Sequence, residues 1–169
     1  MIGVVCPPYQ YKPEKDRFNA AQSGMMASNL TIELNYLLKQ LYKEPTEIVL
    51  KSYKYLNFFI GSNDICFRCS NDLPWLSSEQ FETYLKSALD TIRKELPNTI
   101  VNLLGVFNVS QVYNFRHEEY CKGWGIVADY ECSCAFAPGK VHSIIKKEII
   151  FLKNSVNKEI FNNRGIGSY

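Results

Sequence analysis

The sequence contains no long hydrophobic run, almost no excess of charge and no recognisable leader. Its apolar stretches, such as residues 56–60, are far shorter than the about 20 apolar residues that a membrane-spanning helix needs. A formal net charge of +2 gives no reason to expect binding to nucleic acid or to an acidic membrane. Residues 1–6 are apolar, but they have no basic start and precede two prolines, so we expect no signal peptide in this chain.

What the sequence does contain is the composition of an ordinary globular domain. Hydrophobic residues make up 46% and charged residues 21%, and 169 residues are enough for one domain with a core. Expected strands at residues 55–60 and 99–107, the second one buried on both faces, alternate with expected helices at 30–41, 77–96 and 141–156. Helices of this length between strands imply crossover connections and a parallel sheet. The predicted fold class is therefore α/β, a three-layer sandwich with a parallel, flavodoxin-like sheet and no second domain.

The expected strand at residues 55–60 ends abruptly at Gly61, and Asn63 and Asp64 follow directly. Glycine permits a tight turn, so we expect Asn63 and Asp64 in a loop at the carboxyl end of the strand, where ligands bind in open α/β sheets. A side-chain amide held there can donate a hydrogen bond to a developing oxyanion. The alternative is a plain turn, because Asn and Asp favour turns by bonding their own backbone.

A second glycine turn stands upstream, in the segment that runs from Asn19 to Gly24. It can bring a backbone N–H to the same place as the Asn63 amide. Asn19 can brace this turn, because Asn side chains often bond the backbone two residues on.

These two segments resemble blocks of the GDSL (SGNH) hydrolases, and the likeness is closest to the phospholipase B branch of that family. Gly61-Ser62-Asn63-Asp64 is similar to the third block, Gly-x-Asn-Asp, and residues 19–24 are similar to the second block, Asn-x-Ala-x-x-Gly. The likeness extends over residues 18–162, with a cysteine-rich insertion at 111–138. Further similar segments are Cys66-Phe67-Arg68-Cys69, Val101-Asn102-Leu103-Leu104, Tyr120-Cys121 and Cys132-Ser133-Cys134.

The resemblance implies hydrolysis of an acyl ester of a phospholipid or lysophospholipid, by transfer of the acyl group to a serine and then to water. It implies no metal and no organic cofactor. In the family the oxyanion is bound by the N–H of the nucleophile, the glycine N–H of the second block and the Asn amide of the third block. The matching positions in this sequence are Gly24 and Asn63, with Asn19 and Asp64 as supporting residues. Asp64 is expected to tie the loop rather than to act as an acid.

The two blocks that supply the nucleophile and the base in this family have no counterpart here. No Gly-Asp-Ser occurs in the sequence, and neither His117 nor His142 follows an Asp by three positions. We therefore expect one partial domain over residues 1–169, truncated at both ends and inactive as it stands. The alternative function is that of a non-catalytic relative with the same fold that binds lipid or a protein partner.

The six cysteines leave three interpretations open. Disulfide bonds are favoured, since close cysteine clusters in such a domain are typical of secreted chains. In a zinc site Cys66 and Cys69 could supply two ligands, but Cys132-Ser133-Cys134 departs from the usual second pair and His117 would have to help. Free or redox-active thiols are the third option. The candidate disulfide residues are Cys66, Cys69, Cys121, Cys132 and Cys134, with Cys6 left over.

The compartment and partners expected for the full-length protein follow from this resemblance and from the cysteines. We expect it to be secreted or to lie on the extracellular face of a membrane. Its expected partners are phospholipids or other acyl-ester lipids, with contact to a membrane surface left open and no nucleic acid. A third, weaker alternative is a small interaction domain stabilised by zinc or disulfides.

Overall fold

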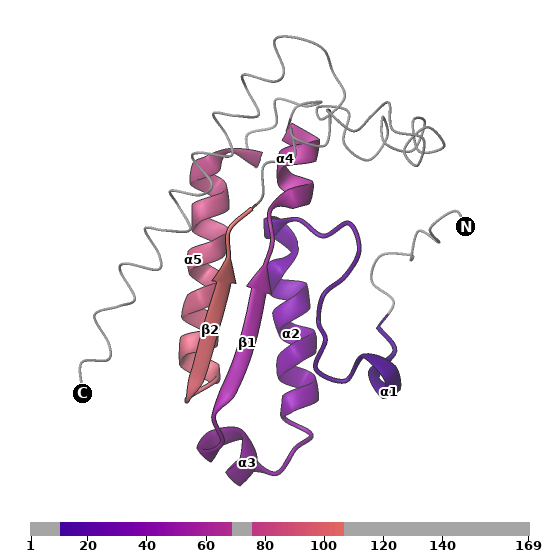
Figure 1. Ribbon diagram of the computed structural model, residues 1–169, viewed down its shortest axis with the longest axis vertical. Helices are drawn as coiled ribbons and strands as arrows, with labels where there is room; N and C mark the ends of the chain where they lie inside the picture. Colours follow the sequence, from indigo (N-terminus) through magenta and orange to yellow (C-terminus); the bar gives the residue numbers. More distant parts are fainter. Residues whose placement is uncertain (1–10, 69–75, 107–169) are drawn as a thin grey trace, which may run out of the picture.

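The computed structural model of the chain describes residues 11–68 and 76–106 (Figure 1). The expected helix at 141–156, the cysteine-rich insertion at 111–138 and both histidines lie outside these residues. The described elements are α1 (Pro13–Asp16), the 3₁₀ turn η1 (Ala27–Asn29), α2 (Leu30–Leu41), α3 (Thr46–Lys51), β1 (Lys54–Phe59), α4 (Ser62–Arg68), α5 (Ser78–Glu95) and β2 (Thr99–Leu104).

The two strands form a parallel sheet, with Lys54 opposite Thr99 and Phe59 opposite Leu104. Helix α5 makes the crossover between them, as the length of the helical pattern predicted. Figure 1 shows both arrows running the same way, with α4 beyond the tip of β1. The prediction of an α/β fold with a parallel sheet is confirmed, here as an incomplete fold.

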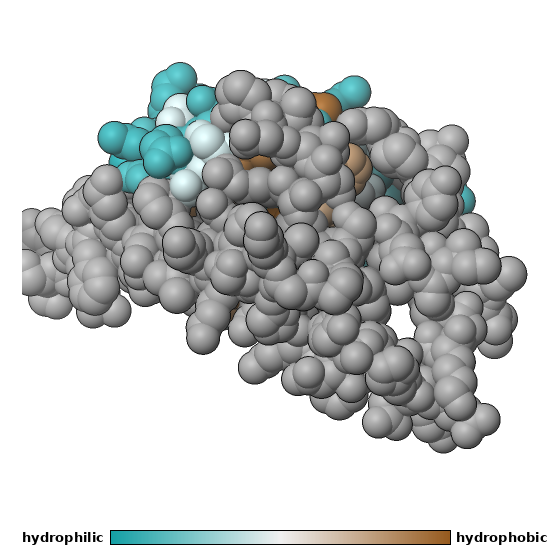
Figure 2. All heavy atoms as spheres, turned by 90° about the horizontal axis from the view of Figure 1, so that it is seen from above, coloured by the Kyte–Doolittle hydropathy of each residue, from teal (hydrophilic) through white to brown (hydrophobic). Residues whose placement is uncertain are grey.

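One face of the sheet is covered by α2 and α5, which contact each other (Figure 1). Phe58 belongs to the core that these helices form, and Leu56, Val101 and Leu103 pack against it. The core side chains of the helices recur every three or four residues, so each helix buries one stripe. They are Leu30, Leu34 and Leu37 on α2 and Phe81, Leu85, Ala88, Leu89 and Ile92 on α5. Figure 2, seen from above, shows hydrophilic residues gathered at the upper left of the described part, with hydrophobic ones visible toward the centre.

Local sequence signals predict both ends of helix α5. The Ser77 hydroxyl accepts a hydrogen bond from the Gln80 N–H at 3.2 Å, which is the expected N-terminal cap. The buried stripe continues to Leu96, and Pro97 then ends the helix because it cannot supply a backbone N–H.

The opposite face of the sheet is open among the described residues. Side chains alternate along a strand, and here Tyr55 and Ile100 are 65% and 61% exposed. The expectation that the second strand is buried on both faces is therefore wrong, and β2 also ends at Leu104 rather than at residue 107. Between the apolar pairs on this face, the Asn102 amide donates to Asn57 Oδ1 at 2.9 Å. The prediction of a second helical layer over this face concerns residues outside the described ranges and stays a prediction.

Candidate active site at the carboxyl end of β1

Gly61 lies in the tight turn between β1 and α4. Its φ of +115° is a conformation that side chains rarely adopt, and a Cβ built on it would lie 2.7 Å from Val106 Cγ2 and 3.0 Å from Phe81 Cε2. Both the backbone and the space around it therefore require glycine. The tight turn that the sequence predicted after the strand is present, but Asn63 and Asp64 are not in a loop. They form the first turn of α4, which the sequence analysis missed.

The Asn63 side chain reaches across 38 positions of sequence to the second glycine turn. Its amide nitrogen donates to the carbonyl oxygen of Met25 at 2.7 Å. Met25 is buried and directly follows Gly24, so this hydrogen bond joins α4 to the segment that carries the candidate glycine. The two blocks singled out in the sequence are thus brought together at the carboxyl end of β1.

Asp64 makes a second tie between the same two segments. Its side chain is buried, and both carboxylate oxygens accept a hydrogen bond from the Ala27 N–H, at 3.1 and 3.0 Å. Burial raises the pKa of Asp64 to about 6, because the charged form loses its water, and the backbone N–H of Ala27 offsets only part of this. The contacts fit the expected role of a structural acceptor.

Gly24 has a different environment from Gly61. Its φ of +79° also lies in the left-handed region, but a Cβ built on it would have nothing within 4 Å. The residue is exposed to solvent. Its conformation, rather than its surroundings, requires glycine. That the Gly24 N–H and the Asn63 amide can bind one shared oxygen stays a prediction.

Asn19 lies in the loop that leads to this turn. Its side-chain oxygen accepts from the Ala21 N–H at 3.2 Å, so it braces the loop locally. Asn19 also lines a cavity of about 370 Å³ between this loop, α2 and β1, together with Phe18, Glu33 and Phe58.

Two side chains near the site were missed in the sequence. Glu33 on α2 accepts from the Gln22 N–H at 3.0 Å, and burial raises its pKa. A signal for it existed, since Glu33 falls beside Leu34 near the buried stripe of α2. Tyr11 stacks on Tyr36 with ring centroids 3.6 Å apart, and its hydroxyl donates to the Ala20 carbonyl at 2.8 Å. Burial and the nearby charge of Glu33 raise the pKa of Tyr11 to about 12.

Of the candidate disulfide residues, only Cys66 lies in the described part of the chain. It sits on α4 and is disulfide-bonded. The other five cysteines lie outside the described residues, so the connectivity stays a prediction. Within residues 11–68 and 76–106, no group of three His, Cys, Asp or Glu side chains could hold a metal ion.

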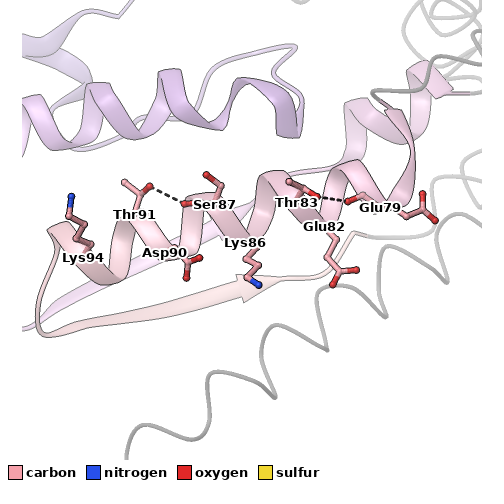
Figure 3. A pocket seen from close by; sticks show the side chains of 8 residues that line it. All are labelled: Glu79, Glu82, Thr83, Lys86, Ser87, Asp90, Thr91 and Lys94. Carbon is pink, nitrogen blue, oxygen red and sulfur yellow. Dashed lines mark hydrogen bonds between the residues drawn. The ribbon is translucent and has the colours of Figure 1, made fainter.

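A larger hollow, of about 700 Å³, lies on α5 away from these residues. Figure 3 shows that all eight lining side chains come from this one helix. Two of them, Thr83 and Thr91, bond the backbone oxygens of Glu79 and Ser87 within the helix. The lining is the solvated, charged side of an amphipathic helix and brings no second described element to a reacting group.

The described residues define an α/β chain with a polar site at the carboxyl end of a parallel strand. No family model and no solved structure matches the chain. Three curated proteins match it, all described as phospholipase B1, membrane-associated. The mouse protein (Mus musculus) is 25% identical over 120 residues, or 71% of this chain; the rat protein (Rattus norvegicus) is 26% identical over 117 residues, or 69%; and the human protein (Homo sapiens) is 27% identical over 116 residues, or 69%.

The chain spans 8% of the length of these relatives. The matches are distant and partial, and they support a relationship to lipolytic hydrolases. None of the helices in the described residues is long and apolar enough to cross a membrane.

Proposed function

We propose that the chain is part of a lipolytic ester hydrolase of the phospholipase B kind, within the GDSL (SGNH) family. In this proposal it supplies two donors of the oxyanion hole, the Gly24 N–H and the Asn63 amide. The observation that carries it is the 2.7 Å hydrogen bond from Asn63 to Met25. This bond joins Asn63 to the residue that directly follows Gly24, although 38 positions separate Asn63 from Met25, and so supports a shared role for Asn63 and Gly24.

The chemistry of the Asn63 amide suits both tasks. A side-chain amide nitrogen carries two hydrogens, and the bond to Met25 uses one of them. The second hydrogen remains for the oxygen that becomes negative when an ester carbonyl is attacked. Because Asn63 is held at the start of a helix, it needs little reorganisation when the charge develops.

The remaining groups of the reaction come from outside the blocks present here. A serine in a Gly-Asp-Ser turn attacks the acyl carbon, and a histidine in an Asp-x-x-His takes the serine proton. Neither motif occurs in the 169 residues. The proposed substrate class is phospholipid, which the name of the matched relatives supports, or lysophospholipid, which the resemblance to the phospholipase B branch implies. The disulfide-bonded Cys66 supports the further proposal that the full-length protein is secreted or lies on the extracellular face of a membrane, since disulfides persist in oxidising compartments.

A second candidate function is supported by the missing motifs. A relative without nucleophile and base keeps the fold and binds lipid or a protein partner. Sequencing the genomic regions on both sides separates the two candidates. Gly-Asp-Ser upstream and Asp-x-x-His downstream support the hydrolase, whereas stop codons without such blocks support the binding protein.

The test of the hydrolase is an extended protein that carries both missing blocks, assayed on lysophospholipid and on a simple acyl ester. We expect hydrolysis by the extended protein and none by the 169-residue chain. Asn63→Ala should lower kcat by about 10²–10³-fold with little change in KM, because the amide acts mainly in the transition state.

The matched control is Asn102→Ala, which removes an amide that also makes one side-chain hydrogen bond, but on the open face of the sheet. It should leave kcat within about threefold of the parent, as is usual for a change away from reacting groups. Equal losses in both variants would contradict the oxyanion role of Asn63. Hydrolysis by the unextended chain, with a serine-reactive inhibitor control for contaminants, would overturn the assignment of missing groups.

A further inference from the structure

Side chains from several elements hold the backbone of the loop at residues 20–27. Tyr11 donates to the Ala20 carbonyl, and Glu33 accepts from the Gln22 N–H. These two contacts fix the first half of the loop against the segment before α1 and against α2. A loop that is anchored at successive peptide groups has few conformations left.

The second half of the loop is anchored from α4. Asn63 donates to the Met25 carbonyl, and Asp64 accepts from the Ala27 N–H. The Met26 N–H donates a hydrogen bond to Asn29 Oδ1 at 3.1 Å. The loop is therefore held from both sides by side chains of α2 and α4, while its own backbone contributes one long contact, from Met25 to Gln22 at 3.5 Å.

Ser23 and Gly24 stand between the two anchored halves. Both are exposed, and within the described residues neither N–H group makes a hydrogen bond. The fixed peptide groups on either side determine where these two N–H groups point. Two adjacent backbone donors that face solvent are suited to a negatively charged oxygen.

We propose that Glu33 is a positioning residue, which holds the loop through Gln22 so that the Ser23 and Gly24 N–H groups stay available to one anionic oxygen. This inference rests on the proposed function, in which the Gly24 N–H binds the oxyanion. Glu33 itself touches no substrate. It acts through the peptide group of Gln22, from the α2 side, as Asn63 and Asp64 act from the α4 side.

A carboxylate has a physical advantage in this role. A charged acceptor bonds a backbone N–H about twice as strongly as a neutral one. Partial burial disfavours the charged form of Glu33 and so raises its pKa. The hydrogen bond from the Gln22 N–H favours the charged form and offsets part of this effect. The negative charge of Glu33 also contributes to the raised pKa of the neighbouring Tyr11.

The test uses the ¹⁵N-labelled 169-residue chain and butyrate as a probe that presents an anionic oxygen. Butyrate should shift the amide resonances of Ser23 and Gly24 in the parent protein. Glu33→Ala should weaken butyrate binding by about tenfold and speed exchange of the Gln22 N–H by about tenfold, as expected for losing one hydrogen bond to a charged group. Glu33→Gln keeps an acceptor oxygen in place and should bind within about threefold of the parent.

Glu44→Ala is the matched control, since it removes an exposed carboxylate just beyond α2 and should leave both readouts unchanged. If Glu33→Ala does not fold, Glu33→Asp replaces it, because the shorter side chain keeps the charge but falls short of Gln22. Parent-like butyrate binding in the folded variant, Ala or Asp, overturns the role of Glu33 and leaves the hydrolase proposal standing. If butyrate does not shift the Ser23 and Gly24 resonances of the parent protein, these amides are not donors. That result would count against the role of Glu33 and against the hydrolase proposal.

Discussion

The two glycine turns of the candidate site are required for different reasons. At Gly61 the backbone is left-handed and Val106 and Phe81 fill the space where a side chain would begin. At Gly24 the backbone is also left-handed, but the space is open. The first turn is therefore part of the packed core, whereas the second is an exposed loop whose shape depends on side chains that reach it from α2 and α4. We therefore expect substitution of Gly61 to affect mainly the stability of the fold, and substitution of Gly24 to affect mainly the shape of the loop.

The largest expected effect is that of Gly61→Ala. It combines the cost of a left-handed conformation with overpacking against Val106 and Phe81, and together these amount to about 2–5 kcal/mol of unfolding free energy. Urea denaturation of the parent and the variant measures the difference. A loss below about 1 kcal/mol would show that the turn can relax and that the two glycines are alike.

Asp64 allows a second test, in which pH replaces substitution as the variable. Its pKa of about 6 exceeds the ordinary value of 3.8, so the folded state holds this proton more tightly than the unfolded state. The proton on Asp64 therefore contributes about 3 kcal/mol to the free energy of unfolding. This contribution is fully present below about pH 4 and is lost as the pH rises through about 6. In Asp64→Asn this part of the pH dependence should vanish.

Denaturation of Asp64→Asn, parent and Glu44→Gln at several pH values between about 4 and 8 checks this. Glu44 is exposed, so its removal should leave the profile unchanged. Parallel profiles for the parent and Asp64→Asn would mean that Asp64 is not buried as described, and the tie to Ala27 would then lose its support.

The smallest expected effect is that of Gly24→Ala, about 1–2 kcal/mol, because only the backbone conformation is strained. Gly105→Ala is its matched control, since that glycine also has open space for a Cβ but no left-handed backbone. The control should be neutral or stabilising by up to about 1 kcal/mol. If both variants lose the same stability, the left-handed turn at Gly24 contributes nothing of its own.

Much of the fold could be predicted because its signals are local. The cap at Ser77 and the stripe from Phe81 to Ile92 lie within one helix, and periodicity reveals both. The strand at residues 54–59 was expected within one residue at either end. The open face at Ile100 could not be predicted in this way, because the composition of a strand does not show whether a second layer of the same chain covers it.

The site was predicted only in part, because its key contacts are tertiary. Locally, Asn63 and Asp64 suit a turn as well as the first turn of a helix, so the short-range signals could not decide between a loop and the start of α4. Their side chains bond Met25 and Ala27, which lie 38 and 37 positions away. Glu33 could have been suspected from its place beside Leu34 near the stripe of α2, but its partner Gln22 could not.

The hydrogen bond between Asn57 and Asn102 marks the register in which the two strands pair. The amides stand directly opposite each other, among apolar neighbours on the open face. A slip by one residue would turn Phe58 from the core to solvent. A slip by two would restore the faces but set Asn57 against Ile100 or Leu104, leaving both amides without each other. Only the observed register both keeps Phe58 in the core and joins Asn57 to Asn102, so any other register loses at least one of these contacts.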